Sequence, residues 1–256
     1  MAITTYAIWM QETKAGPLTP RSTELKAIDQ ALQQYETQGR TTKELIHLKK
    51  TLEAWIKSKG AAWKTSVRNQ KGAVEKLRTE IKALLVDVQL DVPLVGQKVG
   101  YDNQPLMQPN ARGDLVQHGF MACWYASACM VSYYFRAGPR LGLPAVWKPD
   151  QGLTLAAINS LATIEGLVAV PKPAGGLTHD AVLDLLVEHG PIWAAGHYLD
   201  GHPRAGHAIT ISGVEGPFVH YNDPWEPKAK KRPAQWINSH LLNLPNALLV
   251  KNPARQ

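Results

Sequence analysis

Residues 117–135 read QHGFMACWYASACMVSYYF. The apolar spacing after Cys123 predicts a helix that runs to about Arg136. Its inward face would carry Trp124, Ala128, Val131 and Phe135. A cysteine in the first turn of a helix lies where the partial positive charge of the helix favours the thiolate. Cys123 is therefore the candidate nucleophile, whereas Cys129 fits a small buried side chain with no chemical role.

Two downstream segments carry the polar residues that a cysteine nucleophile needs. Gly206-His207-Ala208 opens an apolar strand, and a turn at residues 215–217 leads back through a second strand to Asp223-Pro224-Trp225. Antiparallel strands of this length can bring His207 and Asp223 side by side. His207 would then act as the base and Asp223 would orient its ring. Gln117 would donate a side-chain N–H to the oxyanion that forms on an attacked carbonyl.

The order of these motifs resembles that of the papain-like cysteine proteases, and most closely their compact bacterial branch. That branch includes bacteriocin-processing double-glycine peptidases and some secreted effector proteases. The resemblance covers about residues 90–250 and implies an α+β fold with the nucleophile on a helix and the base on a strand. It implies a thiol protease that hydrolyses peptide bonds through Cys123, His207, Asp223 and Gln117, with no cofactor.

The resemblance also bears on two points of detail. Asn222 is an alternative third member of the site, but Asp223-Pro224-Trp225 repeats the family's step from the third residue to a tryptophan. Phe120-Met121-Ala122 stand where the fuller papain signature has further Gly and Cys residues, so the family's disulfide is missing there. Among the other histidines, His220 would face away from the site or pack in the sheet, whereas His197 and His202 lie in the loop before His207 and either could contact the substrate. A metal site is not expected, because the chain has no HExxH motif and no paired cysteines.

Bulky residues near the catalytic motifs are candidates for substrate binding: Trp124, Trp193, His197 and Trp225. Bulky walls would narrow the cleft and favour a protein substrate cut at a Gly-Gly or small-residue site. Two alternative enzymes use related chemistry, a peptidoglycan-cleaving amidase or endopeptidase and a transglutaminase-like acyl transferase. A third alternative is a catalytically dead scaffold that serves the N-terminal helices.

The N-terminal third predicts a separate helical bundle over residues 1–88, which would serve in delivery, as an adaptor or in regulation. Amphipathic helices are expected from Ser22 or Thr23 to Gly39, from Thr41 to Gly60 and from Trp63 to Leu85. The second domain, residues 89–256, would hold the protease. Beyond the segments already named, it predicts helices over 154–164 and 178–188, strands over 192–195, 208–214 and 218–221, and a solvated loop over Lys228–Arg232.

Composition limits the setting of the protein. Residues 1–90 contain fifteen Lys/Arg and nine Asp/Glu, so most of the net charge of +7 lies in the bundle. This excess indicates a solvated helix face more than a nucleic-acid surface, because no nucleic-acid motif accompanies it. Cys123 and Cys129, six residues apart on one helix, point apart and cannot form a disulfide, which favours a reducing site of action. Neither a signal peptide nor a membrane span is expected.

A second resemblance concerns the bundle. The residues Ser58-Lys59-Gly60, Trp63-Lys64, Ser66, Arg68-Asn69 and Gly72-Ala73-Val74 resemble the N-terminal region of bacterial antibacterial effectors, including type VI secretion cargo. This implies a toxin that is secreted without a conventional signal peptide and acts in the cytoplasm of a target cell. It also implies a secretion-machinery partner and a cognate immunity protein. The alternative location is the cytoplasm of the producing cell.

Overall fold

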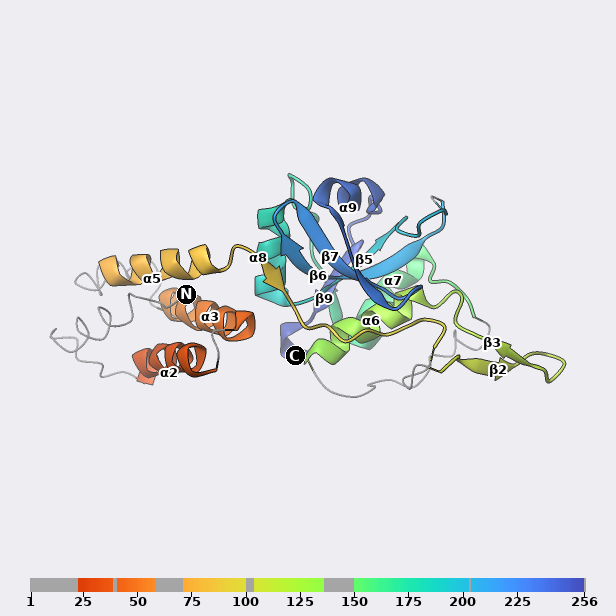
Figure 1. Cartoon of the computed structure of the whole chain (residues 1–256), viewed down its shortest axis with the longest axis horizontal. Helices are drawn as coiled ribbons and strands as arrows, with labels where there is room; N and C mark the ends of the chain where they lie inside the picture. Colours follow the sequence, from red (N-terminus) through yellow and green to blue (C-terminus); the bar gives the residue numbers. More distant parts are fainter. Residues whose placement is uncertain are drawn as a thin grey trace. The chain divides into compact units, whose positions relative to one another are not determined.

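The computed structural model describes residues 23–38, 41–58, 71–99, 104–135, 150–202 and 204–255. The chain divides into two compact units, Met1–Asp87 and Val88–Gln256. The first unit contains helices, and the second combines helices with a sheet (Figure 1).

The N-terminal unit is a small helical bundle of α2 (Thr23–Thr37), α3 (Thr42–Ser58) and α5 (Lys71–Leu84). Helix α3 contacts both of the others. Each helix buries a set of apolar side chains, which fits the amphipathic pattern: Ile28, Leu32, Tyr35, Leu45, Leu48, Leu52, Trp55, Leu77 and Ile81. Residues 59–70, with the predicted start of the third helix and most of the effector-like motif, lie outside the described residues, as does the N-terminal lead-in before residue 23.

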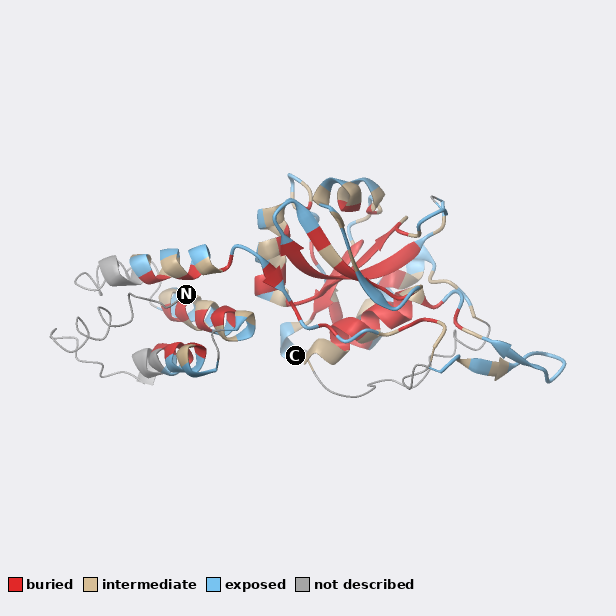
Figure 2. Cartoon of the chain, viewed as in Figure 1, coloured by how far each residue is buried: buried red, intermediate tan, exposed pale blue. Residues whose placement is uncertain are grey.

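An antiparallel sheet organises the second unit. Its strands lie in the order β4 (Leu167–Ala169), β9 (Leu248–Lys251), β5 (Ile192–Gly196), β6 (His207–Glu215), β7 (Phe218–Asp223) and β8 (Lys228–Pro233). A short strand, β1 (Val88–Gln89), also pairs with β6. Strands β5 and β6 are buried along nearly their whole length, so both faces of the central sheet are covered (Figure 2).

Helices pack on this sheet and connect its strands. They are α6 (Cys123–Phe135), η3 (Leu155–Ala157), α7 (Ile158–Glu165), α8 (His179–His189), α9 (Ala234–His240) and η4 (Pro253–Arg255). Helix α6 lies against β5, β6 and β9, and α8 packs against β5, β6 and β7. The expected α+β papain-like architecture, preceded by a helical bundle, is confirmed. None of the helices in the described ranges is both long and apolar enough to span a bilayer.

The sequence did not predict β4, β9 or α9, and two further parts of the second unit also differ from expectation. The basic run Lys228–Arg232 was predicted to be a solvated loop but forms β8, the outermost strand beyond β7. Lysines are common on such edges because their charge discourages pairing with another sheet. In addition, β2 (Met107–Pro109) and β3 (Leu115–Gln117) form a separate hairpin just before the nucleophile helix. Gln117 belongs to this hairpin.

Candidate active site

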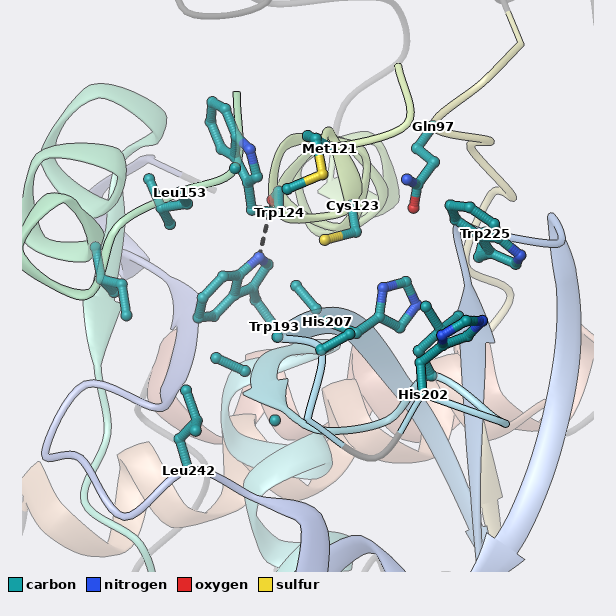
Figure 3. Close-up of a pocket in the computed structure, with 18 of the residues that line it drawn as sticks. Gln97, Met121, Cys123, Trp124, Leu153, Trp193, His202, His207, Trp225 and Leu242 are labelled. Atoms are coloured by element: carbon teal, nitrogen blue, oxygen red, sulfur yellow. Dashed lines mark hydrogen bonds between the residues drawn. The ribbon is translucent and has the colours of Figure 1, made fainter. Parts of the chain in front are cut away.

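Cys123 is the first residue of α6 and is partly buried. The carbonyl of Ala122 accepts the first bond of the helix, 3.0 Å from the amide nitrogen of Ala126. The backbone N–H groups of the first turn have no partner within a helix, so the Cys123 thiol lies at a positively polarised end. Its sulfur faces the ring of His207 across the site (Figure 3).

Three hydrogen bonds fix α6 to the sheet. The Ser127 hydroxyl donates to the carbonyl of Ala208 at 3.0 Å, and the Thr210 hydroxyl donates to the carbonyl of Ser127 at 3.0 Å. The Trp193 indole donates to the carbonyl of Trp124 at 2.9 Å. All three are buried, so they hold the nucleophile helix at a set height over β5 and β6. These buried bonds therefore fix the distance between Cys123 and β6, the strand that carries the base.

His207 and Asp223 meet across neighbouring strands. The register pairs Thr210 of β6 with Asn222 of β7, which makes His207 and Asp223 diagonal neighbours on one face. His207 Nε2 lies 2.8 Å from Asp223 Oδ1, and both side chains are buried. The ring also forms a hydrogen bond with Cys123. Because Nε2 is occupied by Asp223, Nδ1 is the ring nitrogen available to the thiol.

The electrostatics of the pair favour charge on both partners. Burial opposes the protonated ring, but the hydrogen bonds to Asp223 and to Cys123 outweigh it and raise the pKa of His207 to about 9. For Asp223, burial pushes the pKa upward. Hydrogen bonds from His207 and Lys230 reverse this effect, and the pKa ends below its usual range. At neutral pH the site therefore favours an imidazolium beside an ionised carboxylate.

Gln117 is not brought to this site. It lies at the end of β3 with its side chain exposed, and its amide donates to the carbonyl of Lys98 at 3.2 Å. It is also not among the residues that line the pocket at Cys123. The spacing of six residues was misleading because the β2–β3 hairpin precedes the nucleophile and turns Gln117 outward. The prediction of Gln117 as the oxyanion donor is corrected on this geometry.

A different glutamine, Gln97, stands beside the nucleophile (Figure 3). It is 1% exposed, and its backbone N–H donates to the carbonyl of Pro224 at 2.9 Å, which ties its segment to the Asp223 loop. Its amide nitrogen contacts the carbonyls of Gly119 and Phe120 at 3.1 and 2.8 Å. Among the described residues, its Oε1 has no hydrogen-bond partner. Sequence reasoning missed Gln97. The available signal was an amide side chain within the otherwise apolar run of residues 92–97.

The turn that leads into α6 is held by Asp150. Its carboxylate accepts the backbone N–H groups of Gly119, Phe120 and Met121 at 3.0, 2.9 and 2.9 Å. Gly119 has φ +95°, and a Cβ there would come within 1.8 Å of the Gln97 carbonyl oxygen. Only glycine meets both conditions. Asp150 and Gln97 thus hold the same turn. Asp150 accepts hydrogen bonds from the backbone N–H groups of the turn, and Gln97 donates hydrogen bonds to its carbonyls.

A pocket of about 520 Å³ opens beside Cys123 and His207. Three of the predicted substrate-binding residues line it, Trp124, Trp193 and Trp225. Other apolar residues complete the lining, including Met121, Leu153, Leu155, Ile158, Leu199 and Leu242. The tryptophans therefore border an apolar pocket.

His197 does not line the pocket. It follows the end of β5, and its ring lies 3.3 Å from the carbonyl of Ala205, where it braces the loop before β6. His202, on that same loop, lines the pocket in its place (Figure 3). The predicted role of His197 in substrate binding is therefore corrected in favour of His202.

The alternatives to the three catalytic candidates have other partners. Asn222 is buried and donates to the carbonyl of Val92 at 3.0 Å. His220 lies 3.1 Å from Glu215. Burial raises the pKa of the Cys129 thiol to about 12, which keeps it protonated. No three His, Cys, Asp or Glu side chains gather as a metal site within the described ranges.

One comparison with known proteins bears on this geometry. The family model described as papain-like cysteine protease AvrRpt2 matches residues 109–241, more than half of the chain. The match contains Cys123, His207 and Asp223, whereas Gln97 precedes it.

Proposed function

The chain belongs to the family of the papain-like cysteine protease AvrRpt2 and is a peptide hydrolase, and from this premise we propose that Cys123, His207 and Asp223 are its catalytic triad. The observation that carries the proposal is the buried 2.8 Å contact between His207 Nε2 and Asp223 Oδ1, with the Cys123 sulfur facing the same ring (Figure 3). In it a thiol, a base and an orienting carboxylate follow one another at the start of a helix.

The reaction is acyl transfer to the thiol and then to water. The Cys123 thiolate attacks a peptide carbonyl, and the carbonyl π electrons move onto the oxygen. As the tetrahedral intermediate collapses, the C–N bond breaks and the leaving amine takes a proton from the His207 imidazolium. The neutral ring then removes a proton from water, whose oxygen attacks the thioester. The C–S bond then breaks, the carboxylic acid leaves, and the released thiolate with the proton on His207 restores the thiolate–imidazolium pair.

The oxyanion is stabilised by the Cys123 backbone N–H and by the Gln97 side chain. Both N–H groups of the Gln97 amide are engaged by the carbonyls of Gly119 and Phe120, so one of them would have to leave its carbonyl and turn to the oxyanion as it forms. Gln97 takes the role first assigned to Gln117. Support comes from its burial, its position in the pocket lining and its bond to the Pro224 carbonyl.

The substrate is a protein, and the pocket favours a large apolar side chain near the cut. Its volume of about 520 Å³ and its apolar lining are suited to such a group. Profiling cleavage sites by N-terminal labelling of a digested bacterial lysate tests this. Enrichment of large apolar residues at one position near the cut would support binding of such a side chain in the pocket. A consensus of only glycine and alanine would support the Gly-Gly or small-residue expectation.

The triad is tested with fluorescein-labelled casein and a matched pair of cysteine variants. We expect Cys123→Ala to lose all hydrolysis above background, and Cys129→Ala to keep most of it. Both substitutions remove one sulfur atom from the same helix, so a difference between them reports chemistry and not helix packing. Thermal unfolding of both variants shows that each is folded. Full activity in Cys123→Ala would sink the proposal.

We further propose that the protease is a bacterial effector toxin that acts in the cytoplasm of a target cell. The proposal is supported by the motif resemblance at residues 58–74, by the absence of a cysteine pair suited to a disulfide, and by a helical unit separate from the catalytic one. That unit would serve delivery, and a type VI secretion component and an immunity protein would be its partners. A competition assay between producer and recipient bacteria tests this role. Equal survival of recipients facing wild-type and Cys123→Ala producers would contradict it.

The rival reactions remain distinguishable. A peptidoglycan amidase or endopeptidase would release muropeptides from purified cell wall, and a transglutaminase-like enzyme would join proteins through new isopeptide bonds. Membership in a protease family favours cleavage of proteins over both. Mass spectrometry of casein and cell-wall digests separates the three.

A further inference from the structure

The triad carboxylate has a partner beyond the triad. Oδ1 of Asp223 lies 2.8 Å from Nε2 of His207 and accepts the backbone N–H of Trp225 at 2.9 Å. Oδ2 accepts a hydrogen bond from Lys230 Nζ at 2.6 Å. Asp223 is 1% exposed and the Lys230 side chain is 17% exposed, so this ion pair is shielded from water.

The β7–β8 pairing delivers this lysine to Asp223. Asp223 is opposite Lys228, and Lys230 is two residues further along β8. Residues two apart on a strand share a face, so Lys228 and Lys230 both lie on the Asp223 side of the sheet. Lys228 is 59% exposed and pairs with Glu226 at 2.8 Å. Lys230 reaches Glu226 at 3.4 Å and also the buried carboxylate.

A buried carboxylate needs a partner for each oxygen. With only Oδ1 satisfied, the orientation of the Asp223 carboxylate would depend on that oxygen alone, and its unpaired oxygen would favour protonation. Either change weakens the bond that holds the His207 ring. We propose that Lys230 is a positioning residue of the triad, which keeps Asp223 ionised and holds Oδ1 toward His207. This inference rests on the proposed triad.

The charges around Asp223 set the direction of the expected effect. His207 faces it from β6, with Cys123 of α6 beyond the ring, and Tyr221, Glu226 and Lys230 approach from β7, the following turn and β8. Burial raises the pKa of Asp223, and the bonds from His207 and Lys230 lower it. Loss of Lys230 therefore moves the protonation of Asp223 to higher pH. As the pH is lowered, activity should then be lost at a higher pH than in the wild type.

The test compares Lys230→Met with Lys228→Met, two lysines of the same strand and face that differ in their contact with Asp223. With labelled casein, we expect Lys230→Met to lower kcat about tenfold with KM little changed. The acid limb of its kcat/KM profile should shift upward by about one pH unit. Lys230→Arg should restore most of the activity, and Lys228→Met should match the wild type. Lys230→Gln serves as the second uncharged variant where Lys230→Met does not fold.

A double-mutant cycle separates positioning from a merely structural ion pair. If Lys230 acts through Asp223, then Lys230→Met should lower kcat no further in an Asp223→Ala background. Equal kcat and equal acid limbs in Lys230→Met and Lys228→Met would overturn the inference. So would a full additional loss of kcat in the double variant. Cys123→Ala, measured in parallel, reports on the triad itself, so failure of the proposed function is recognised separately.

Discussion

Replacing Gln97 tests whether this residue, and not Gln117 as the sequence suggested, donates to the oxyanion. Gln97→Met keeps the length of the side chain and removes its N–H donors, while Gln117→Met makes the same change at the exposed residue first assigned the role. An oxyanion donor contributes about 10²–10³ in turnover, which corresponds to about 2.7–4 kcal/mol. Replacing an exposed residue such as Gln117, whose hydrogen bond lies at the surface, should change the energy by no more than about 0.5 kcal/mol. The two variants should therefore differ by at least about 2.2 kcal/mol, which is about fortyfold in kcat.

Steady-state hydrolysis of labelled casein provides the assay. Because the oxyanion exists only after attack, loss of its donor should appear in kcat while KM stays near the wild-type value. Gln97 also holds the carbonyls of Gly119 and Phe120, so thermal unfolding must be measured for each variant. A folded Gln97→Met protein with unchanged kcat, or a Gln117→Met protein with the larger loss, would refute the reasoning.

Three further predictions concern the base, its titration and the turn before the nucleophile. His207→Ala should reduce casein hydrolysis to near background, whereas His220→Ala, whose ring pairs with Glu215, should keep most of its rate; similar losses in both would contradict the assignment. The pKa of His207 is raised from 6.5 to about 9. The charged ring therefore adds to the free energy of unfolding in full below pH 6.5, and this stabilisation is lost as the pH rises through about 9. The alkaline limb of kcat/KM should accordingly have its midpoint near 9, and a midpoint near 6.5 would show that the ring is not coupled to Asp223. Asp150→Ala should lower the free energy of unfolding by about 1–3 kcal/mol and turnover by about tenfold, since three backbone N–H groups lose their acceptor; unchanged denaturant melts and turnover would remove Asp150 from the support of the site.

Local sequence patterns predicted much of the fold. An apolar run indicated the strand that begins at His207, and helical spacing indicated the helix that begins at Cys123, because burial imposes these patterns directly. The strand at Lys228–Arg232 was missed because its residues are polar on both faces, and pairing with β7 alone makes it a strand. A polar edge strand of this kind cannot be predicted from a hydrophobic pattern.

The site was less predictable than the fold. The meeting of Cys123, His207 and Asp223 followed from a helix start and a strand pair, which are local features. Gln97 lies twenty-six residues before Cys123 in the sequence and reaches it only because the chain between them leaves as a hairpin and returns. Lys230 was hidden for a similar reason, since its contact with Asp223 depends on strand register. Tertiary contacts of this kind leave no periodic signal in a single sequence.

The central claim is that Cys123 reacts as a thiolate because His207 holds the proton. The most direct measurement is the rate of alkylation by iodoacetamide across pH, with the modified cysteine identified by mass spectrometry, in the wild type and in His207→Ala. The account predicts rapid modification of Cys123 at neutral pH in the wild type, slow modification in His207→Ala, and little reaction at the buried Cys129 in either protein. Modification of Cys129 first, or a Cys123 rate that is the same with and without His207, would contradict it.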